Sequence, residues 1–171
     1  MFSRSKFLLA MAGLAFAAPA FAAPVAAPTP PPGRALLLVP LTLTKVQDIH
    51  FGTIVPSTTT AGFVSINAVT GARTGSAGLT LMPTDVGQRG RFGGAGTPNQ
   101  QVIIALTPPT ELTNPAGDTI PVLAMNLDGP TTRTIAANHS FFVGVGGVIF
   151  IAANQAEGLY SADYDLTADY Q

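Results

Sequence analysis

Short apolar runs separated by turn-forming residues recur along the chain from residue 35 onward. Gly, Pro, Asn and Thr stand between the runs, and these residues favour turns. No stretch of eleven or more residues has the apolar spacing of an amphipathic helix. The pattern predicts an all-β protein, and nine short strands favour an immunoglobulin-like antiparallel β-sandwich. The runs are residues 35–46, 51–55, 63–66, 79–82, 102–106, 120–125, 141–143, 148–152 and 159–170.

The last eleven residues before the terminal glutamine alternate strictly between two kinds of side chain. Odd positions hold Ser, Asp or Thr, and alternation with period two places them on one face of a strand. The sequence predicts one long strand with an acidic outer face and all three tyrosines of the protein turned inward. The even, inward positions are Tyr160, Ala162, Tyr164, Leu166, Ala168 and Tyr170.

Two glycine-rich segments are interpreted as turns. Residues 141–151 hold two β-branched and aromatic runs around Gly144-Val145-Gly146-Gly147, which predicts a tight hairpin with positive φ angles in its turn. Residues 83–99 are mostly Gly, Thr, Arg and Gln, which predicts an exposed loop.

The first residues have the three parts of a secretory signal peptide. Arg4 and Lys6 precede an apolar run over residues 7–18, and the small-residue triplet Ala20-Phe21-Ala22 follows. Pro19 ends the run well short of the roughly 20 apolar residues that a transmembrane helix needs. We therefore expect residues 1–22 to be removed and the protein to reach the periplasm, the cell surface or the extracellular space.

The expected mature chain has a spacer and one domain. Residues 23–34 contain five prolines, a composition that favours extended polyproline conformation. Residues 35–171 remain for a single β-sandwich domain, which is long enough to bury a core. No later segment is long and apolar enough to span a bilayer.

Few residues of the chain are charged, and this excludes some classes of function. Lys and Arg number 8 against 9 Asp and Glu, and 10% of the residues are charged, whereas about 25% is usual. Loss of Arg4 and Lys6 with the signal peptide leaves a net charge of −3. A nucleic-acid binder driven by charge is therefore not expected. The absence of Cys excludes disulfides and thiolate zinc sites.

The residues that could carry catalysis or bind metal are sparse. His50 is expected to face solvent, and His139 precedes Ser140, but neighbours in a strand point to opposite faces. Asp163 and Asp165 are expected to lie about 6.8 Å apart along a strand, which is too far for both to ligate one ion directly. Together with Asp169 they are therefore interpreted as a solvated face. We expect no enzyme, no metal and no cofactor.

Several short motifs follow one another along the second part of the chain. They are residues 40–56 (PLTLTKVQDIHFGTIVP), residues 70–75 (TGARTG), Phe141-x-Val143-Gly144, Ala152-Ala-Asn154-Gln155-x-x-Gly158-x-Tyr160 and Tyr170-Gln171. In this order they resemble the bacterial family called domain of unknown function 4402, and the resemblance covers most of residues 40–171. It implies a secreted protein without an assigned activity, related to fimbrial and spore-coat-type β-sandwich subunits, and hence assembly and not chemistry.

The C-terminus also resembles that of subunits handled by a periplasmic chaperone and an outer-membrane usher. Such subunits often carry an alternating last strand with a glycine fourteen residues from the end and a penultimate aromatic residue, positions held here by Gly158 and Tyr170. This implies that the strand offers its edge to an added strand, which is β-augmentation. The expected contact residues are Gly158, Tyr160, Tyr164, Leu166 and Tyr170.

Residues 35–43 are the candidate for a strand donated to a neighbouring subunit. Leu37, Val39, Leu41 and Leu43 share one face of this run. The same run also fits the first strand of the domain itself. The prolines before it cannot replace it, because proline donates nothing to a sheet ladder.

The expected function is a structural or adhesive subunit of a surface appendage or coat that assembles by β-strand exchange. The alternative is a self-sufficient secreted binding module, with residues 57–62 and 83–99 as its contact surface. The expected partners are a chaperone, an usher and further copies of the chain, with no nucleic acid.

Overall fold

The structure is a computed structural model that describes residues 29, 32–76 and 78–171. The chain divides into two units, Met1–Leu36 and Leu37–Gln171, and the second contains every described strand. The expected signal peptide, residues 1–22, lies outside the described residues, and so does most of the expected spacer, residues 23–34. The described part of the chain contains twelve strands and no helix, which confirms the all-β fold.

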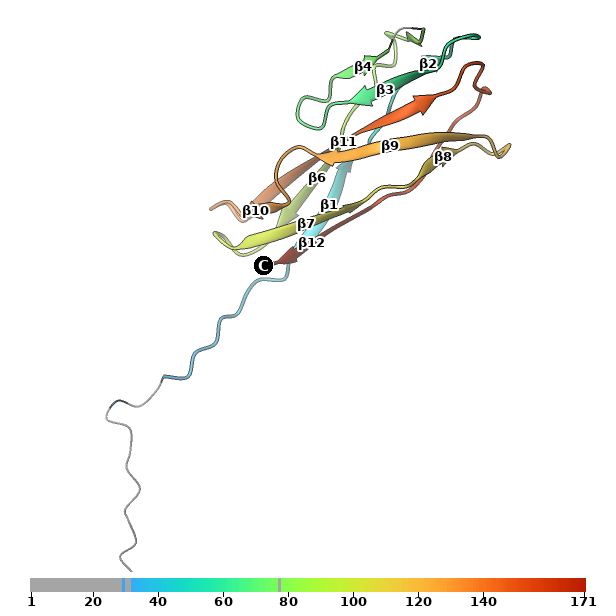
Figure 1. Cartoon of the computed structure of the whole chain (residues 1–171). Helices are drawn as coiled ribbons and strands as arrows, with labels where there is room; N and C mark the ends of the chain where they lie inside the picture. The colour runs from blue at the N-terminus through green and yellow to red at the C-terminus, as the bar shows by residue number, and fades with distance from the viewer. Residues whose placement is uncertain (1–28, 30–31, 77) are drawn as a thin grey trace, which may run out of the picture. The chain divides into compact units, whose positions relative to one another are not determined.

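The larger sheet is antiparallel and is built on one long strand, β11 (Ser140–Ile151). Its other strands are β1 (Thr42–Gln47), β3 (Gly62–Ile66), β4 (Arg73–Gly75), β6 (Gly90–Ala95), β8 (Glu111–Thr113) and β9 (Thr119–Leu127). β6 pairs with the first half of β11, while β3 and β9 pair with the second half (Figure 1). Gly147 is paired with both Ile66 of β3 and Met125 of β9, so β11 has no free edge there.

A smaller sheet packs against the first half of this large sheet. In it β7 (Gln101–Thr107) lies between β10 (Thr132–Thr134) and β12 (Asp165–Tyr170). β2 (Ile54–Val55) and β5 (Thr80–Leu81) form a separate two-stranded ladder. All of these pairings are antiparallel, and the two main sheets form a β-sandwich.

The buried side chains form two clusters arranged along β11. Odd-numbered residues of β11 point to one face of the sheet because side chains alternate along a strand. Phe141, Val143 and Val145 belong to the first cluster, where β7 and β12 cover them. Ile149 and Ile151 belong to the second cluster. No strand of the smaller sheet packs against the second cluster. The partly buried residues that do pack against it come from β2, β5, β8, β9 and irregular segments: Phe51, Ile54, Leu79, Leu81, Leu112, Val122 and Tyr160.

The prediction of a hairpin over residues 141–151 is wrong. These residues lie within the single strand β11, and none of its glycines has a positive φ angle. The glycines serve close packing: a Cβ on Gly146 would overlap the backbone of Ala68, and one on Gly144 would lie 2.6 Å from the carbonyl oxygen of Ala68. The segment that follows β3 therefore crosses β11 at backbone distance, which no larger residue permits.

The prediction of an exposed loop over the whole of residues 83–99 is also wrong, because a strand lies within this range. Its second half contains β6, which lies between β1 and β11 in the large sheet. Gly94 is paired with Phe141 of β11, and a Cβ on Gly94 would overlap the Phe141 ring. Glycine at this position makes room for an aromatic side chain of the core, and it is not the mark of a turn.

The C-terminal alternation matches the structure over β12. Leu166, Ala168 and Tyr170 are half-buried, while the residues between them are exposed. Tyr160 and Tyr164 are half-buried as well, but Ala162 between them, which was also expected to face inward, is exposed. Regular strand begins only at Asp165, later than expected.

Replacing Gly94 with alanine tests the packing of β6 on β11. We expect G94A to lower the free energy of unfolding by about 3 kcal/mol, because an overpacked core forces neighbouring groups apart. G93A is the matched control, since a Cβ there lies 3.5 Å from the Phe142 ring, an ordinary contact. Urea unfolding measures both variants. Equal stability of the two would contradict the role assigned to Gly94.

Two tyrosines with opposite surroundings give a second test. The Tyr164 hydroxyl is buried without a hydrogen-bond partner in the described structure, and burial raises its pKa to about 12. The Tyr170 hydroxyl donates to the Val39 carbonyl oxygen and accepts from the Thr97 amide, both at 2.7 Å. We expect Y164F to keep or slightly raise stability at pH 7, and Y170F to lose about 1 kcal/mol.

The pH dependence of Tyr164 has a definite sign. Its pKa in the unfolded chain is about 10, so its neutral form is favoured on folding. The resulting stability is complete below pH 10 and is lost as the pH rises toward 12. Urea unfolding at pH 7 and pH 11 should show a smaller alkaline loss for Y164F than for the unchanged chain. A larger loss at pH 7 for Y164F than for Y170F would contradict these assignments.

Candidate functional site

A groove of about 750 Å³ opens over the second cluster. Its floor is apolar and comes from Ile149 and Ile151 of β11, Ile120 of β9 and Leu112 of β8. Two segments form its walls: residues 49–56, which include β2, and residues 155–162, which precede β12. The groove exists because the smaller sheet covers only the first cluster, and β12 does not begin until Asp165.

Arg73 holds the first wall in place. Its guanidinium donates from Nη1 to the carbonyl oxygens of Phe51 (3.1 Å) and Thr53 (3.2 Å), and from Nη2 to that of Met82 (2.6 Å). One side chain of β4 thus ties two loop segments to the large sheet. Because its planar fork presents several donors in fixed directions, arginine suits this position better than lysine.

A small polar network lies behind the same wall. The Thr53 hydroxyl donates to Asp85 at 2.8 Å, and His50 Nδ1 lies 3.4 Å from the other carboxylate oxygen. The hydrogen bond from Thr53 is the main cause that lowers the pKa of Asp85, and the charge of His50 lowers it further. These residues fix residues 50–53 against residues 82–88.

The second wall is braced by side chains of its own segment. The Tyr160 hydroxyl donates to the carbonyl oxygen of Ala156 (2.8 Å) and accepts from Gln155 Nε2 (3.1 Å). Gln155 also donates to the Thr119 carbonyl oxygen of β9. Ser161 forms two backbone hydrogen bonds with Thr113 of β8. The wall is therefore attached at both ends. In its middle, Leu159 is 79% exposed.

The chemistry of the groove suits binding of an apolar chain. Its lining is mainly apolar, and its ionisable side chains are His50, Asp85, Glu157 and Tyr160. Thr53 directs its hydroxyl to Asp85 and not to His50, so no hydroxyl is paired with an imidazole base there. Within residues 32–76 and 78–171, no cluster of three His, Asp or Glu side chains is placed to hold a metal ion.

The structure divides the candidate donor run into two parts. Leu41 and Leu43 pack against the first cluster, and β1 begins at Thr42 and pairs with β6. This part is an intrinsic strand. Leu37 and Val39 are 86% and 53% exposed, and they precede the first described strand, β1.

The C-terminal residues singled out from the sequence also separate. Gly158 and Tyr160 line the groove. Tyr164, Leu166 and Tyr170 pack against the first cluster, within their own sandwich. The three carboxylates expected on the outer face of the last strand are exposed: Asp163, which precedes β12, and Asp165 and Asp169 within it.

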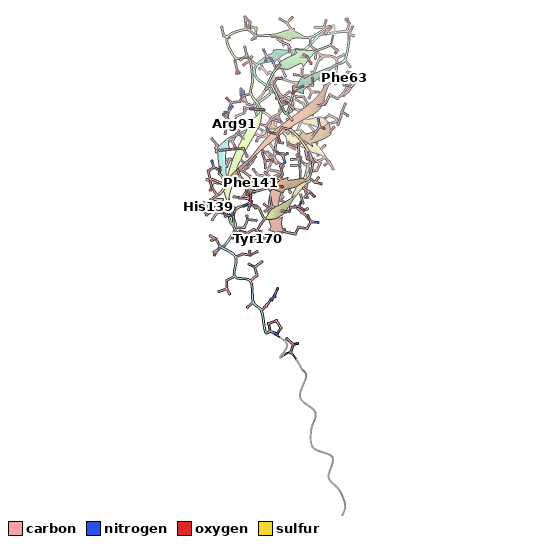
Figure 2. All side chains as sticks on the ribbon, turned by 90° about the vertical axis from the view of Figure 1, so that its left-hand side faces the viewer. Phe63, Arg91, His139, Phe141 and Tyr170 are labelled. Carbon is pink, nitrogen blue, oxygen red and sulfur yellow. The ribbon has the colours of Figure 1, made fainter. Side chains whose placement is uncertain are left out.

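Other candidate residues lie away from the groove. His139 is exposed in a turn with a φ angle of 67° and faces the Gly96 carbonyl oxygen at 3.2 Å. It lies near the same end of the sandwich as Phe141 and Tyr170 (Figure 2). A shallow hollow of about 480 Å³ opens there beside Arg133 and the exposed ring of Phe142. Residues 57–62 form a threonine-rich bend next to the groove, where Ser57 accepts the Asn154 amide.

Sequence reasoning missed Arg73 and Asp85, which hold the first wall of the groove. Neither residue has a catalytic or metal-binding spacing. Their partners, such as Phe51 for Arg73 and Thr53 for Asp85, lie in distant segments of the chain, so no local signal could have found them.

These features define an antiparallel β-sandwich domain with an open groove at one end. The family model described as domain of unknown function (DUF4402) matches residues 41–170, and the chain belongs to this family. No curated protein and no solved structure matches the chain. Among residues 32–76 and 78–171, no helix is long and apolar enough to cross a membrane.

The role of Arg73 can be measured by hydrogen exchange. We expect R73A to speed exchange of the His50 and Met82 amides about tenfold or more, because loss of a charged hydrogen bond costs about 1.5–3 kcal/mol. Those amides donate to the carbonyl oxygens of Gln88 and Thr53 and report on the first wall. R91A is the control, since Arg91 is exposed on β6. Unchanged exchange in R73A would show that other contacts hold the wall.

Proposed function

We propose that the chain is an exported structural or adhesive subunit of a surface appendage or coat, and that its copies join by exchange of β-strands. The observation that carries the proposal is an uncovered apolar segment beside a completed first cluster. Leu36 and Leu37 are 76% and 86% exposed, and Leu41, four residues after Leu37, packs against the first cluster. Adjacent exposed leucines are costly in water, at about 1.5–3 kcal/mol for each side chain left unburied.

Export is supported by the sequence alone, through the charged, apolar and small-residue parts of residues 1–22. An exposed apolar segment on a soluble protein commonly marks a site of interaction with another surface. In an exported protein, that surface can belong to a further copy of the chain. The open groove over the second cluster supplies a surface of matching polarity.

A self-sufficient binding module is the second candidate. The hollow beside Arg133 and Phe142 favours it, because it combines an exposed aromatic face with the polar side chains of Asn138 and Ser140. Arg133 is already engaged: it donates to Asp128 at 2.7 Å and to the Phe142 carbonyl oxygen at 3.0 Å. Few free polar groups remain there, which favours assembly over ligand binding.

Self-association of the chain expressed from residue 23 tests the proposal. We expect sedimentation velocity to show oligomers that grow with concentration. The double variant L36D/L37D should shift the protein toward monomer by about tenfold or more in association constant, because buried charges are costly. V69D is the control, since Val69 is also an exposed apolar residue, in the turn after β3.

Two results would contradict the proposal. A chain that stays monomeric at all concentrations would favour the binding module. Oligomers unaffected by L36D/L37D, with urea unfolding unchanged, would assign association to another surface.

A further inference from the structure

We propose that the groove over the second cluster is the docking site for residues 33–38 of a second copy of this chain, the segment that ends just before Val39. The inference rests on the proposed function and names the site and the partner. The occupant would lie as an added strand between the two walls, residues 49–56 and 155–162, with its leucines on the floor formed by Ile149 and Ile151.

The walls of the groove are not joined to each other along their length. Among the described residues, no backbone hydrogen bond runs from residues 49–56 to residues 155–162. The amides of residues 156–160 donate to no protein acceptor in the described structure. Such a row of amides is what an incoming strand pairs with in β-augmentation.

The length of the segment fits the groove. Each wall has eight residues, which span at most about 26 Å, and residues 33–38 in extended form span about 20 Å. The prolines before Gly33 end the segment, because proline cannot donate to a ladder.

A chain cannot fill its own groove with this segment. Val39 is fixed by Thr97 and Tyr170, next to the start of β11, where the Gly96 amide bonds to the His139 carbonyl oxygen. The floor of the groove begins at Ile149, about 30 Å farther along β11. Residues 34–38 reach only about 17 Å from Val39. The occupant must therefore come from another copy.

The two ends of the sandwich are distinct in the structure. Phe150, between the floor residues Ile149 and Ile151, packs against Phe63 with 5.5 Å between ring centroids. Phe63 lies near one end of the sandwich and Tyr170 near the other (Figure 2). A contact between opposite ends is head-to-tail, and contacts of this kind join subunits into rings or open chains.

The charges of the segment and of the groove are complementary, which also supports this segment as the occupant. Arg34 is exposed and is the only charged residue in residues 23–44. The ionisable acidic residues of the groove are Asp85 and Glu157, and Asp85 is engaged by Thr53 and His50. Glu157 is exposed and forms no ion pair within the described residues. It is the natural partner for Arg34 of the incoming segment.

A charge exchange tests this pairing in the chain expressed from residue 23. R34E and E157R should each weaken self-association several-fold in sedimentation velocity, and the double variant R34E/E157R should restore it. E111R is the matched control, because Glu111 is exposed on β8 outside the groove. It should neither weaken association nor rescue R34E. Rescue by E111R, or no rescue by E157R, would overturn the pairing.

Cysteine cross-linking locates the contact, since the chain has no cysteine of its own. A mixture of L37C and L159C proteins treated with a short bismaleimide should give the mixed dimer in high yield. L37C mixed with F142C is the control, because Phe142 is 61% exposed on β11 outside the groove.

The outcomes separate the docking site from the proposed function. Oligomers without the L37C–L159C product would overturn the docking site and leave assembly standing. If the bismaleimide instead joins the two cysteines within one molecule of the double variant L37C/L159C, docking between copies would be overturned. Absence of any association would overturn both proposals.

Discussion

The inward face of β11 is the surface on which both hydrophobic clusters are built. Its odd-numbered side chains run from Phe141 in the first cluster to Ile151 in the second, and its edges are occupied by β6, β3 and β9. Glycines on the same strand let the segment after β3 cross at backbone distance. A change in β11 therefore affects both clusters together, and the pairing of the large sheet depends on the register of this one strand.

The same strand explains why the sandwich has an open end. The smaller sheet, with β7 and β12, is long enough to cover only the first half of β11. The second half is covered by a two-residue ladder and by loops that Arg73 and Tyr160 hold in place. In the second of these walls, the amides of residues 156–160 form no backbone hydrogen bond within the described structure. The groove is thus a consequence of unequal sheet lengths.

The sequence was sufficient for the fold class and for β12, because strict alternation over residues 160–170 has only one regular interpretation. It was insufficient for β6 and β11. Gly94 and Gly146 were read as turn residues, yet each is needed because a neighbouring ring or backbone occupies the place of a Cβ. Glycine required for a positive φ angle and glycine required for space look alike in one sequence. The groove depends on contacts between distant segments, such as Arg73 with Phe51, which no local pattern encodes.

The hydrogen bonds at Val39 give the apolar segment a fixed point of departure from the domain. The Tyr170 hydroxyl and Thr97 hold both backbone polar groups of Val39, so the residues before it leave from one defined place and not from a free hinge. Two residues later, Leu41 is packed on the first cluster. A segment that is bound elsewhere through Leu37 is thereby connected to the core by a very short link. Such a link loses little conformational entropy on binding, because few residues remain to be ordered. The penultimate residue, Tyr170, thus helps to fix the point at which the exposed apolar segment leaves the domain, because its hydroxyl donates to the Val39 carbonyl oxygen.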